Sequence, residues 1–505
     1  MWRGALFTIA VVSIASACPG TATAGQPAES TISGAELVAR IEAAEGGDLD
    51  VDVTGLTVIG PVDLTTLRDI DRPLRCLSCT FEGPISAADV VFTSIVELVD
   101  ATFKGAVDAR GAIFQRSSVF DGASFNDGLN LAGAQFDALA SFVGTDIAGT
   151  ANFDRAVLAG RAVFTGSPLD AGAGVGGPCA ATQGAFAGRA SFRGSSFRDA
   201  ALFRQRCFAD SATFEGASFA AAADFTLSTH HGATSFERVA FGADGSFNIA
   251  RFIGPVSFVA ASLAGKLDFD RAEFGSDATF SSLSGSGSLV LDGIIVPEGA
   301  DRPLRLASVT LDGLAMELDR VRFIRGPTVQ REVLELLEST ARARGDTGVA
   351  NNAHFELLTR RNGTLPQPRR FLDRAFYGDV AGYLVRPIHP LICLAVLAML
   401  GTVVRALPTW RRALNARRRP AAILTHLSVG LFGGISDTLS ASWSVRKRPE
   451  PHIELQPQVD AAIGPYMIAG LRWAEWLAVK LLIAVALLGI ANANPTIRSL
   501  VDAVL

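Results

Sequence analysis

Phenylalanine recurs along the middle of the chain at intervals that alternate between five and six residues. The clearest run is Phe186, Phe192, Phe197, Phe203, Phe208, Phe214, Phe219 and Phe225. A helix would scatter residues with this spacing around its circumference, and a flat strand would place the odd intervals on opposite faces. A chain that turns a corner after each short strand returns every Phe to one interior. The pattern therefore predicts a solenoid of stacked coils.

The alternating interval also sets the length of one coil. Two sides of five residues and two of six give 22 residues, so we expect one extra residue at every second corner. This period places Phe186, Phe208 and Phe252 in one stack along the axis. Upstream, Phe recurs at the doubled interval of eleven, at Phe81, Phe92, Phe103 and Phe114, and again at Phe125 and Phe136. About nine coils, stacked about 4.8 Å apart, give a rod roughly 40–45 Å long. Each buried Phe contributes roughly 1.5–3 kcal/mol to its stability.

The residues around each Phe follow a second pattern. The residue two before the Phe is nearly always small, as at Ala101 and Ala212, and Gly, Ser, Asp or Asn fill the corners. This arrangement resembles the pentapeptide-repeat family over roughly residues 81–323, although the strict family period is five. The resemblance implies a mainly β fold, a right-handed quadrilateral β-helix. Aliphatic residues replace Phe after Phe280, and we expect the β-helix to cover residues 51–325.

Both open ends of such a rod need a cover, because they expose unpaired backbone groups. Residues 25–50 contain a capping box formed by Ser33 and Glu36, which predicts a short capping helix. Residues 326–390 have helical spacing that is interrupted at Gly345, which predicts a helical hairpin followed by a juxtamembrane segment.

The two ends of the chain carry targeting and membrane signals. Residues 1–24 read as a secretory signal peptide, although lipidation at Cys18 is an open alternative. Residues 391–505 are expected to form a two-helix membrane domain, because the apolar segments 391–407 and 474–491 are each near the length of a bilayer crossing.

The charges indicate an orientation in the membrane. The loop 408–472 is rich in Arg, so the positive-inside rule places it in the cytoplasm. The β-helix and the C-terminus would then be extracytoplasmic, at a bacterial inner membrane. The whole chain has 45 Lys and Arg against 50 Asp and Glu. Residues 81–325 contain 19 basic and 27 acidic residues, so the rod is acidic and offers no basic stripe for nucleic acid.

Few residues suggest chemistry. Cys76 and Cys79 form a lone Cys-x-x-Cys, which favours a local disulfide or core packing over zinc or redox chemistry. Cys179 and Cys207 are a second candidate disulfide across a Gly- and Pro-rich insertion. The pair His230 and His231 is expected to have a surface role, since neighbouring strand residues point to opposite faces.

Lys480 lies inside the second apolar segment and is a candidate membrane-embedded functional residue. It also lies near enough to the interface for its side chain to snorkel. The segment 425–443 between the spans carries Gly430, Gly433 and Gly434, and is similar to the loop of a two-helix pore domain without its filter sequence.

These observations predict a non-enzymatic, membrane-anchored protein that presents an extracytoplasmic β-helical rod as a binding or scaffold surface. No catalytic, phosphate-binding or dinucleotide motif occurs, and no cofactor or metal is expected. The expected partners are the membrane, which the chain would cross twice, and a protein or an envelope polymer. Assembly into a homo-oligomer is an open alternative. The alternative is a subunit of an oligomeric channel or transporter-like assembly with a degenerate pore domain.

Overall fold

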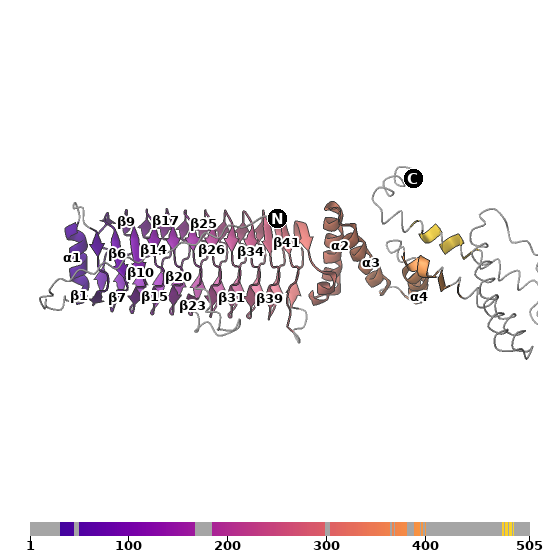
Figure 1. Ribbon diagram of the computed structural model, residues 1–505, viewed down its shortest axis with the longest axis horizontal. Helices are drawn as coiled ribbons and strands as arrows, with labels where there is room; N and C mark the ends of the chain where they lie inside the picture. The colour runs from indigo at the N-terminus through magenta and orange to yellow at the C-terminus, as the bar shows by residue number, and fades with distance from the viewer. Residues whose placement is uncertain are drawn as a thin grey trace, which may run out of the picture.

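The computed structural model describes residues 31–44, 50–166, 184–297 and 303–363, most of 366–380, and separate helical residues within 388–399 and 477–488. Over residues 51–315 the chain winds into a rod of short parallel strands with helices beyond each end (Figure 1). This confirms the predicted mainly β, parallel β-solenoid. The predicted signal peptide lies outside the described residues.

The strands stack in four columns, one for each side of the coil. Most strands have two residues, because each side holds one inward Phe or small residue before the chain turns. The columns run from β3 (Thr57–Ile59) to β39 (Glu273–Phe274), from β4 (Val62–Asp63) to β42 (Leu304–Arg305), from β5 (Asp69–Ile70) to β37 (Ser262–Leu263), and from β2 (Val51–Asp52) and β6 (Leu74–Leu77) to β38 (Lys266–Asp268). The last two columns merge at β41 (Ser284–Val290), which pairs with both β37 and β38 and then with β43 (Thr310–Ala315).

The register between coils is 22 residues, as the Phe spacing predicts. Phe81 pairs with Phe103, and Phe103 pairs with Phe125. Two of the sheets contain eleven strands each, so at about 4.8 Å between neighbouring strands the rod is about 50 Å long. The rod is longer than the predicted nine coils because aliphatic inward residues continue the coiling at both ends.

The extra residue appears at every second corner as a left-handed backbone conformation. Positive φ angles recur every eleven residues, at Ser78, Asp89, Asp100, Gly111, Gly122, Gly133, Gly144 and Arg155, and again from Gly194 through Gln205, Gly216, Leu227, Arg238, Ile249, Ala260, Arg271, Ser282 and Gly293. The sixth residue of the longer sides is therefore absorbed as a bulge, and the inward face keeps its alternation.

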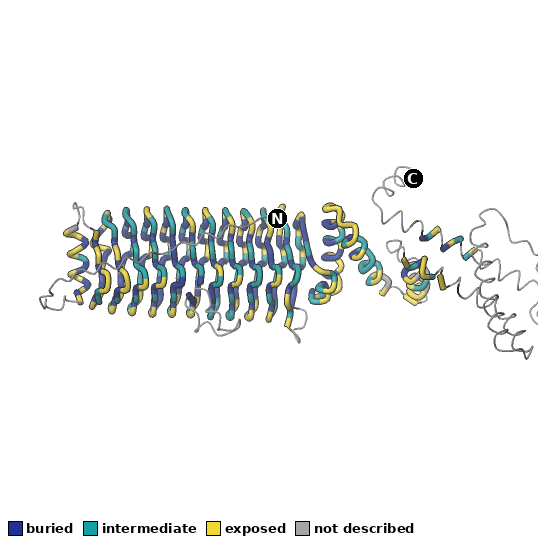
Figure 2. Tube along the Cα trace, viewed as in Figure 1, coloured by how far each residue is buried: buried dark blue, intermediate teal, exposed yellow. Residues whose placement is uncertain are grey.

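The inward side chains form stacked rings. Phe81, Phe103 and Phe125 stack nearly parallel at centroid distances of 5.0 and 4.5 Å. Columns on opposite sides of the coil meet edge to face, as Phe203 and Phe214 do at 5.4 Å and 89°. Such offset and edge contacts are the favourable arrangements of aromatic pairs. Each coil accordingly alternates buried inward and exposed outward residues along the rod (Figure 2).

The N-terminal end is covered by α1 (Gly34–Ala44). The Glu36 amide donates to the Ser33 hydroxyl at 3.1 Å, and Leu37 and Ile41 are buried against the first coils. The sequence pattern missed β1 (Thr31–Ser33), which precedes the helix and adds a parallel strand to the first sheet, with Ile32 opposite Val58.

The C-terminal end is covered by a short 3-10 helix η2 (Leu318–Phe323) and by a hairpin of α2 (Pro327–Ala343) and α3 (Thr347–Gly363). Val333, Leu334 and Leu337 of α2 are buried in the same core as the rings. Thr340 donates through its hydroxyl to the Leu314 carbonyl at 3.1 Å, and this bond joins the hairpin to the last coil.

Beyond the hairpin the structure describes α4 (Arg369–Leu372) and a π-helix, η3 (Asp373–Val380). Within the described residues, none of the helices combines the length and the apolar character that a bilayer crossing requires. The predicted spans 391–407 and 474–491 lie largely outside those residues, as does the loop 408–472.

Candidate functional site

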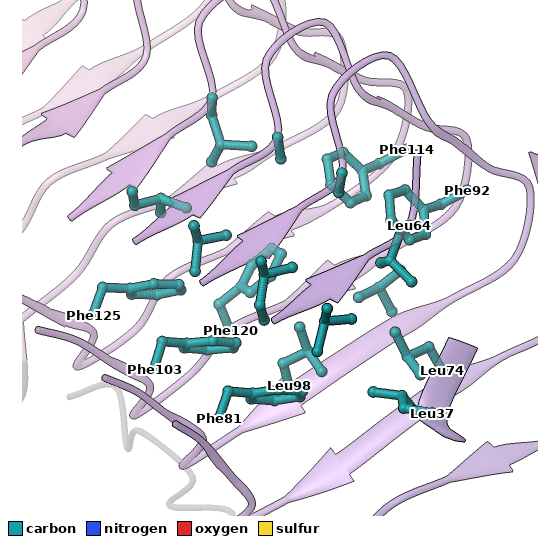
Figure 3. Close-up of a pocket in the computed structure, with 18 of the residues that line it drawn as sticks. Leu37, Leu64, Leu74, Phe81, Phe92, Leu98, Phe103, Phe114, Phe120 and Phe125 are labelled. Atoms are coloured by element: carbon teal, nitrogen blue, oxygen red, sulfur yellow. The ribbon is translucent and has the colours of Figure 1, made fainter. Parts of the chain in front are cut away.

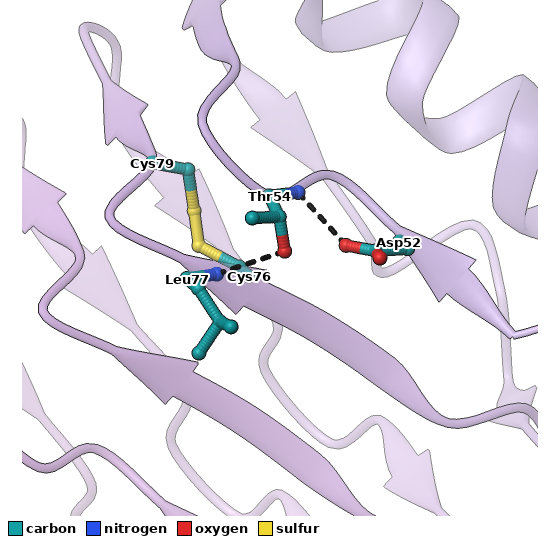
Figure 4. The surroundings of a disulfide bond; sticks show 5 residues. All are labelled: Asp52, Thr54, Cys76, Leu77 and Cys79. Carbon is teal, nitrogen blue, oxygen red and sulfur yellow. Dashed lines mark hydrogen bonds between the residues drawn. A yellow bond between two sulfur atoms is a disulfide. The ribbon is translucent and has the colours of Figure 1, made fainter. Parts of the chain in front are cut away.

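The first distinctive site is a disulfide between Cys76 and Cys79, whose Cα atoms are 5.8 Å apart (Figure 4). Both side chains are buried, and the corner between them passes through Ser78 in a left-handed conformation. On the adjacent coil, the Thr54 hydroxyl accepts the Leu77 amide at 3.3 Å. The bond therefore ties one corner of the first coils and serves a structural purpose.

Beside this corner, Asp52 holds the loop of the preceding coil. Its carboxylate accepts the Thr54 amide at 2.9 Å, and hydrogen bonds from Thr54 lower the pKa of Asp52 below its ordinary value (Figure 4). Across the residues that the structure describes, no three His, Cys, Asp or Glu side chains gather into a metal-binding group.

The second site lies where the regular coiling is interrupted. Ile147 pairs with Phe186 across 39 residues instead of 22, so the coil between these two strands carries 17 additional residues. The chain returns at Gly184, which has a φ of 95°. The Asp146 carboxylate accepts the amides of Gly184 and Ala185, both at 2.9 Å. One carboxylate therefore fixes the point where the chain rejoins the solenoid.

Arg206, from the next coil, fills the space at the base of this insertion. Its side chain is fully buried, in a column where the coils that follow carry Ser228 and Ala250. The guanidinium donates to the carbonyls of Phe142 and Thr145 at 2.6 Å each and to the Phe164 carbonyl at 2.5 Å.

The charge of Arg206 is stabilised by these carbonyls and by its surroundings. The guanidinium also lies over the Phe186 ring, 4.7 Å from the centroid, in a cation–π arrangement. Burial lowers the pKa of Arg206 to about 9, while the nearby Asp146 carboxylate acts in the opposite direction. Arg206 is therefore charged at neutral pH. Its guanidinium supplies a donor to all three carbonyls, and the Phe142 carbonyl also accepts the Thr145 amide at 3.4 Å.

Cys207 follows Arg206 and is disulfide-bonded. It lies with Ala185 in a small buried cluster outside the main core, against Ala209. Cys179, its predicted partner, lies outside the described residues, so the pairing stays a prediction.

His230 corrects the sequence interpretation. It was expected to have a surface role, but its ring is fully buried and occupies a Phe position in the core. Phe225 and Phe236 are eleven residues apart, and His230 stands at the intermediate position where the alternating spacing would place a Phe. The ring nitrogens of His230 are hydrogen-bonded to the hydroxyls of Ser228 at 3.0 Å and Thr234 at 3.2 Å.

Burial lowers the pKa of His230 to about 3, and the neighbouring His231 contributes in the same direction. The ring is therefore neutral near pH 7. His231 points the other way and is half-buried, so the two side chains do not share a ligand site.

The α2–α3 hairpin forms an open groove of about 950 Å³. His354 contacts Glu338 at 3.1 Å, Glu338 also pairs with Arg342 at 2.5 Å, and Arg360 pairs with Glu356 at 2.9 Å. These charges compensate one another within the hairpin. Their arrangement is that of a helix–helix contact.

Lys480 is half-buried among the helical residues described within 477–488. Cys393 is a free, half-buried thiol on the preceding helical segment. The membrane-embedded role predicted for Lys480 stays a prediction.

A comparison with protein families matches residues 98–145 to a profile described as pentapeptide repeats (9 copies). This segment lies within the four-sided part of the rod, so the profile and the geometry agree on a pentapeptide-repeat β-solenoid. A search of curated proteins found no match for the chain.

Proposed function

We propose that this protein is a non-enzymatic scaffold that is held at a bacterial inner membrane by its C-terminal segments and presents the solenoid on the extracytoplasmic side. The solenoid supplies a rigid surface, because each outward position recurs once per coil at fixed register. The C-terminal segments supply the attachment.

The observation that carries the attachment is the distribution of exposed apolar side chains. Of fourteen large hydrophobic residues that are exposed in the described part of the chain, nine lie beyond residue 370. They are Phe371, Ile388, Leu391, Ile392, Val396, Met399, Leu477, Leu481 and Leu488, with exposed fractions of 45–68%. Contiguous exposed apolar surface marks a protein–protein or membrane contact.

The spacing of these residues favours a membrane. Leu477, Leu481 and Leu488 follow one another by four and seven residues, which places them on one helix face. These three residues lie in the segment 474–491, and Leu391, Ile392, Val396 and Met399 lie in the segment 391–407. The composition of both segments suits a bilayer crossing. The Arg-rich loop 408–472 between those segments gives the orientation by the positive-inside rule.

The solenoid surface suits a binding or scaffold role. Ion pairs of opposite sign link successive coils, such as Lys104–Glu82 at 2.7 Å and Arg251–Glu273 at 2.8 Å. Charges of both signs are therefore interspersed, which favours a protein or envelope polymer as partner over nucleic acid. The side chains of Arg206 and His230 are buried, and their hydrogen-bond partners all lie within the solenoid. This supports a structural role for both residues.

Fractionation of cells tests the proposal. Full-length protein is compared with a chain that ends after Gly363 and therefore keeps the solenoid and the hairpin. The full chain is expected to stay in the membrane fraction after an alkaline carbonate wash, whereas the shortened chain is expected in the soluble extracytoplasmic fraction. A full chain that washes off the membrane would refute the attachment.

A further inference from the structure

The N-terminal coils are filled less completely than the rest of the rod. One inward column reads Leu64, Ala87, Ala109, Leu131, Phe153, Phe192, Phe214, Phe236, Phe258 and Phe280 along the axis, by the register of its strands. Phe fills this column from residue 153 onward, while two successive coils before it carry only Ala. The column on the opposite side of the coil contributes Leu98 before Phe120 takes over. Because smaller residues occupy these inward positions, Phe recurs mainly at the doubled interval of eleven in the first coils.

The missing volume remains as an internal cavity of about 70 Å³. It extends from α1 across the first coils as far as Leu131 (Figure 3). All nineteen of the side chains that line it are Ala, Val, Leu, Ile or Phe. A buried water needs two to four polar partners, so a cavity with this lining stays dry.

The cap helix closes one end of the cavity. Leu37 and Ile41 of α1 contribute to its wall, and each is only 2% exposed. In Figure 3, Leu37 and Leu74 lie at one edge, and the stacked rings of Phe81, Phe103 and Phe125 form one side. Displacement of this one helix gives access to the interior without breaking the coils.

We propose that the first coils bind a small, uncharged, apolar molecule in this cavity, of the size of a xenon atom or a short alkane. An engineered cavity of roughly 150 Å³ with a similar apolar lining binds benzene or xenon. The cavity in this protein has about half that volume, so it favours xenon over a six-membered ring. Binding restores the dispersion contacts that the wall residues lack. The proposal is independent of the membrane attachment.

Crystals of the full chain under xenon pressure test the site directly. We expect one anomalous peak between Leu98, Phe103 and Ala109. Ala109→Leu and Ala87→Leu place in the column the residue that it already carries at positions 64 and 131. Either variant is expected to abolish the peak and to raise the melting temperature. Ile253→Ala, which removes an exposed apolar side chain from the outer surface, is the control and should leave the peak unchanged.

Xenon found only at the protein surface or in the detergent would overturn the proposal. So would a peak of full height in both leucine variants. If one leucine variant does not fold, the other variant and the wild-type crystal still decide the outcome. Leu98→Ala gives a further check, because the enlarged cavity should then accept benzene as well.

Discussion

The imidazole of His230 stacks on the ring of Phe208, with 4.7 Å between centroids and 11° between the planes. Phe252 stacks on its other side at 4.8 Å. A titratable ring therefore replaces one Phe in a column of aromatic rings, and this gives the solenoid a specific weakness in acid.

Stability is predicted to fall as the pH drops below about 6.5. The pKa of His230 is about 3 in the folded chain and 6.5 when exposed, so only the unfolded chain takes up the proton between these values. The contribution of neutral His230 is complete above about 6.5 and is lost toward pH 3, at up to about 1.4 kcal/mol per pH unit. His230→Phe should reduce this slope in urea titrations at several pH values. Equal slopes in both proteins would contradict the prediction.

Arg206→Met is predicted to destabilise the solenoid by about 3–5 kcal/mol, because it removes the guanidinium donor from the buried carbonyls of Phe142, Thr145 and Phe164. Arg204 is the control. It lies two residues earlier and is exposed, and it pairs with Asp224 at 2.8 Å. Arg204→Ala should cost less than about 1 kcal/mol. Chemical denaturation measures both variants, and similar losses would show that the buried guanidinium has no special role.

Loss of the Cys76–Cys79 bond is predicted to weaken only the first coils, because each coil of a solenoid contacts mainly its neighbours. Closing so short a loop contributes about 2 kcal/mol. The double variant Cys76→Ser with Cys79→Ser should increase hydrogen exchange over residues 51–103 and leave residues 186–280 unchanged.

The matched variant for the disulfide uses residues of the next coil. Leu98 and Ala101 occupy the positions that correspond to Cys76 and Cys79. Cys76→Leu with Cys79→Ala should therefore protect the first coils better than the serine pair does. Uniform loss of protection along the whole rod would contradict local coupling.

The left-handed corners predict opposite effects at two equivalent positions. Leu227 has a φ of 62° and an exposed side chain, whereas Gly216, eleven residues earlier, has a φ of 68° and open space around it. A side chain at such a φ costs roughly 1–2 kcal/mol. Leu227→Gly should raise the free energy of unfolding by about 1 kcal/mol, and Gly216→Ala should lower it by about 1 kcal/mol. Thermal unfolding of both variants measures the pair, and effects of the same sign would be inconsistent with strain at these corners.

The sequence predicts the regular part of this molecule well, since one period determines the coil length, the pairing register and the stack of Phe186 and Phe208. It predicts the exceptions poorly. His230 occupies a position that the Phe pattern skips. The surface prediction rested on neighbouring strand residues pointing to opposite faces, and that rule does not say which of His230 and His231 points inward. Arg206 stands two residues before Phe208, where the pattern calls for a small residue, so the signal was present in the spacing.

The insertion explains why Arg206 could not be interpreted from local sequence. Its hydrogen-bond acceptors are the carbonyls of Phe142, Thr145 and Phe164, which lie 42–64 residues earlier in the chain. Only the coiled structure brings them to the guanidinium. The cavity beside α1 has the same origin, because the empty space depends on Ala87 and Ala109 facing Leu98 across successive coils.

Placement of the solenoid outside the cytoplasm is tested most directly by reporter fusions in living cells. Alkaline phosphatase, which is active only outside the cytoplasm, and green fluorescent protein are each fused after Gly363. An active phosphatase and a dark fluorescent fusion are predicted. A fluorescent fusion with an inactive phosphatase at this position would place the solenoid in the cytoplasm and contradict the proposed function.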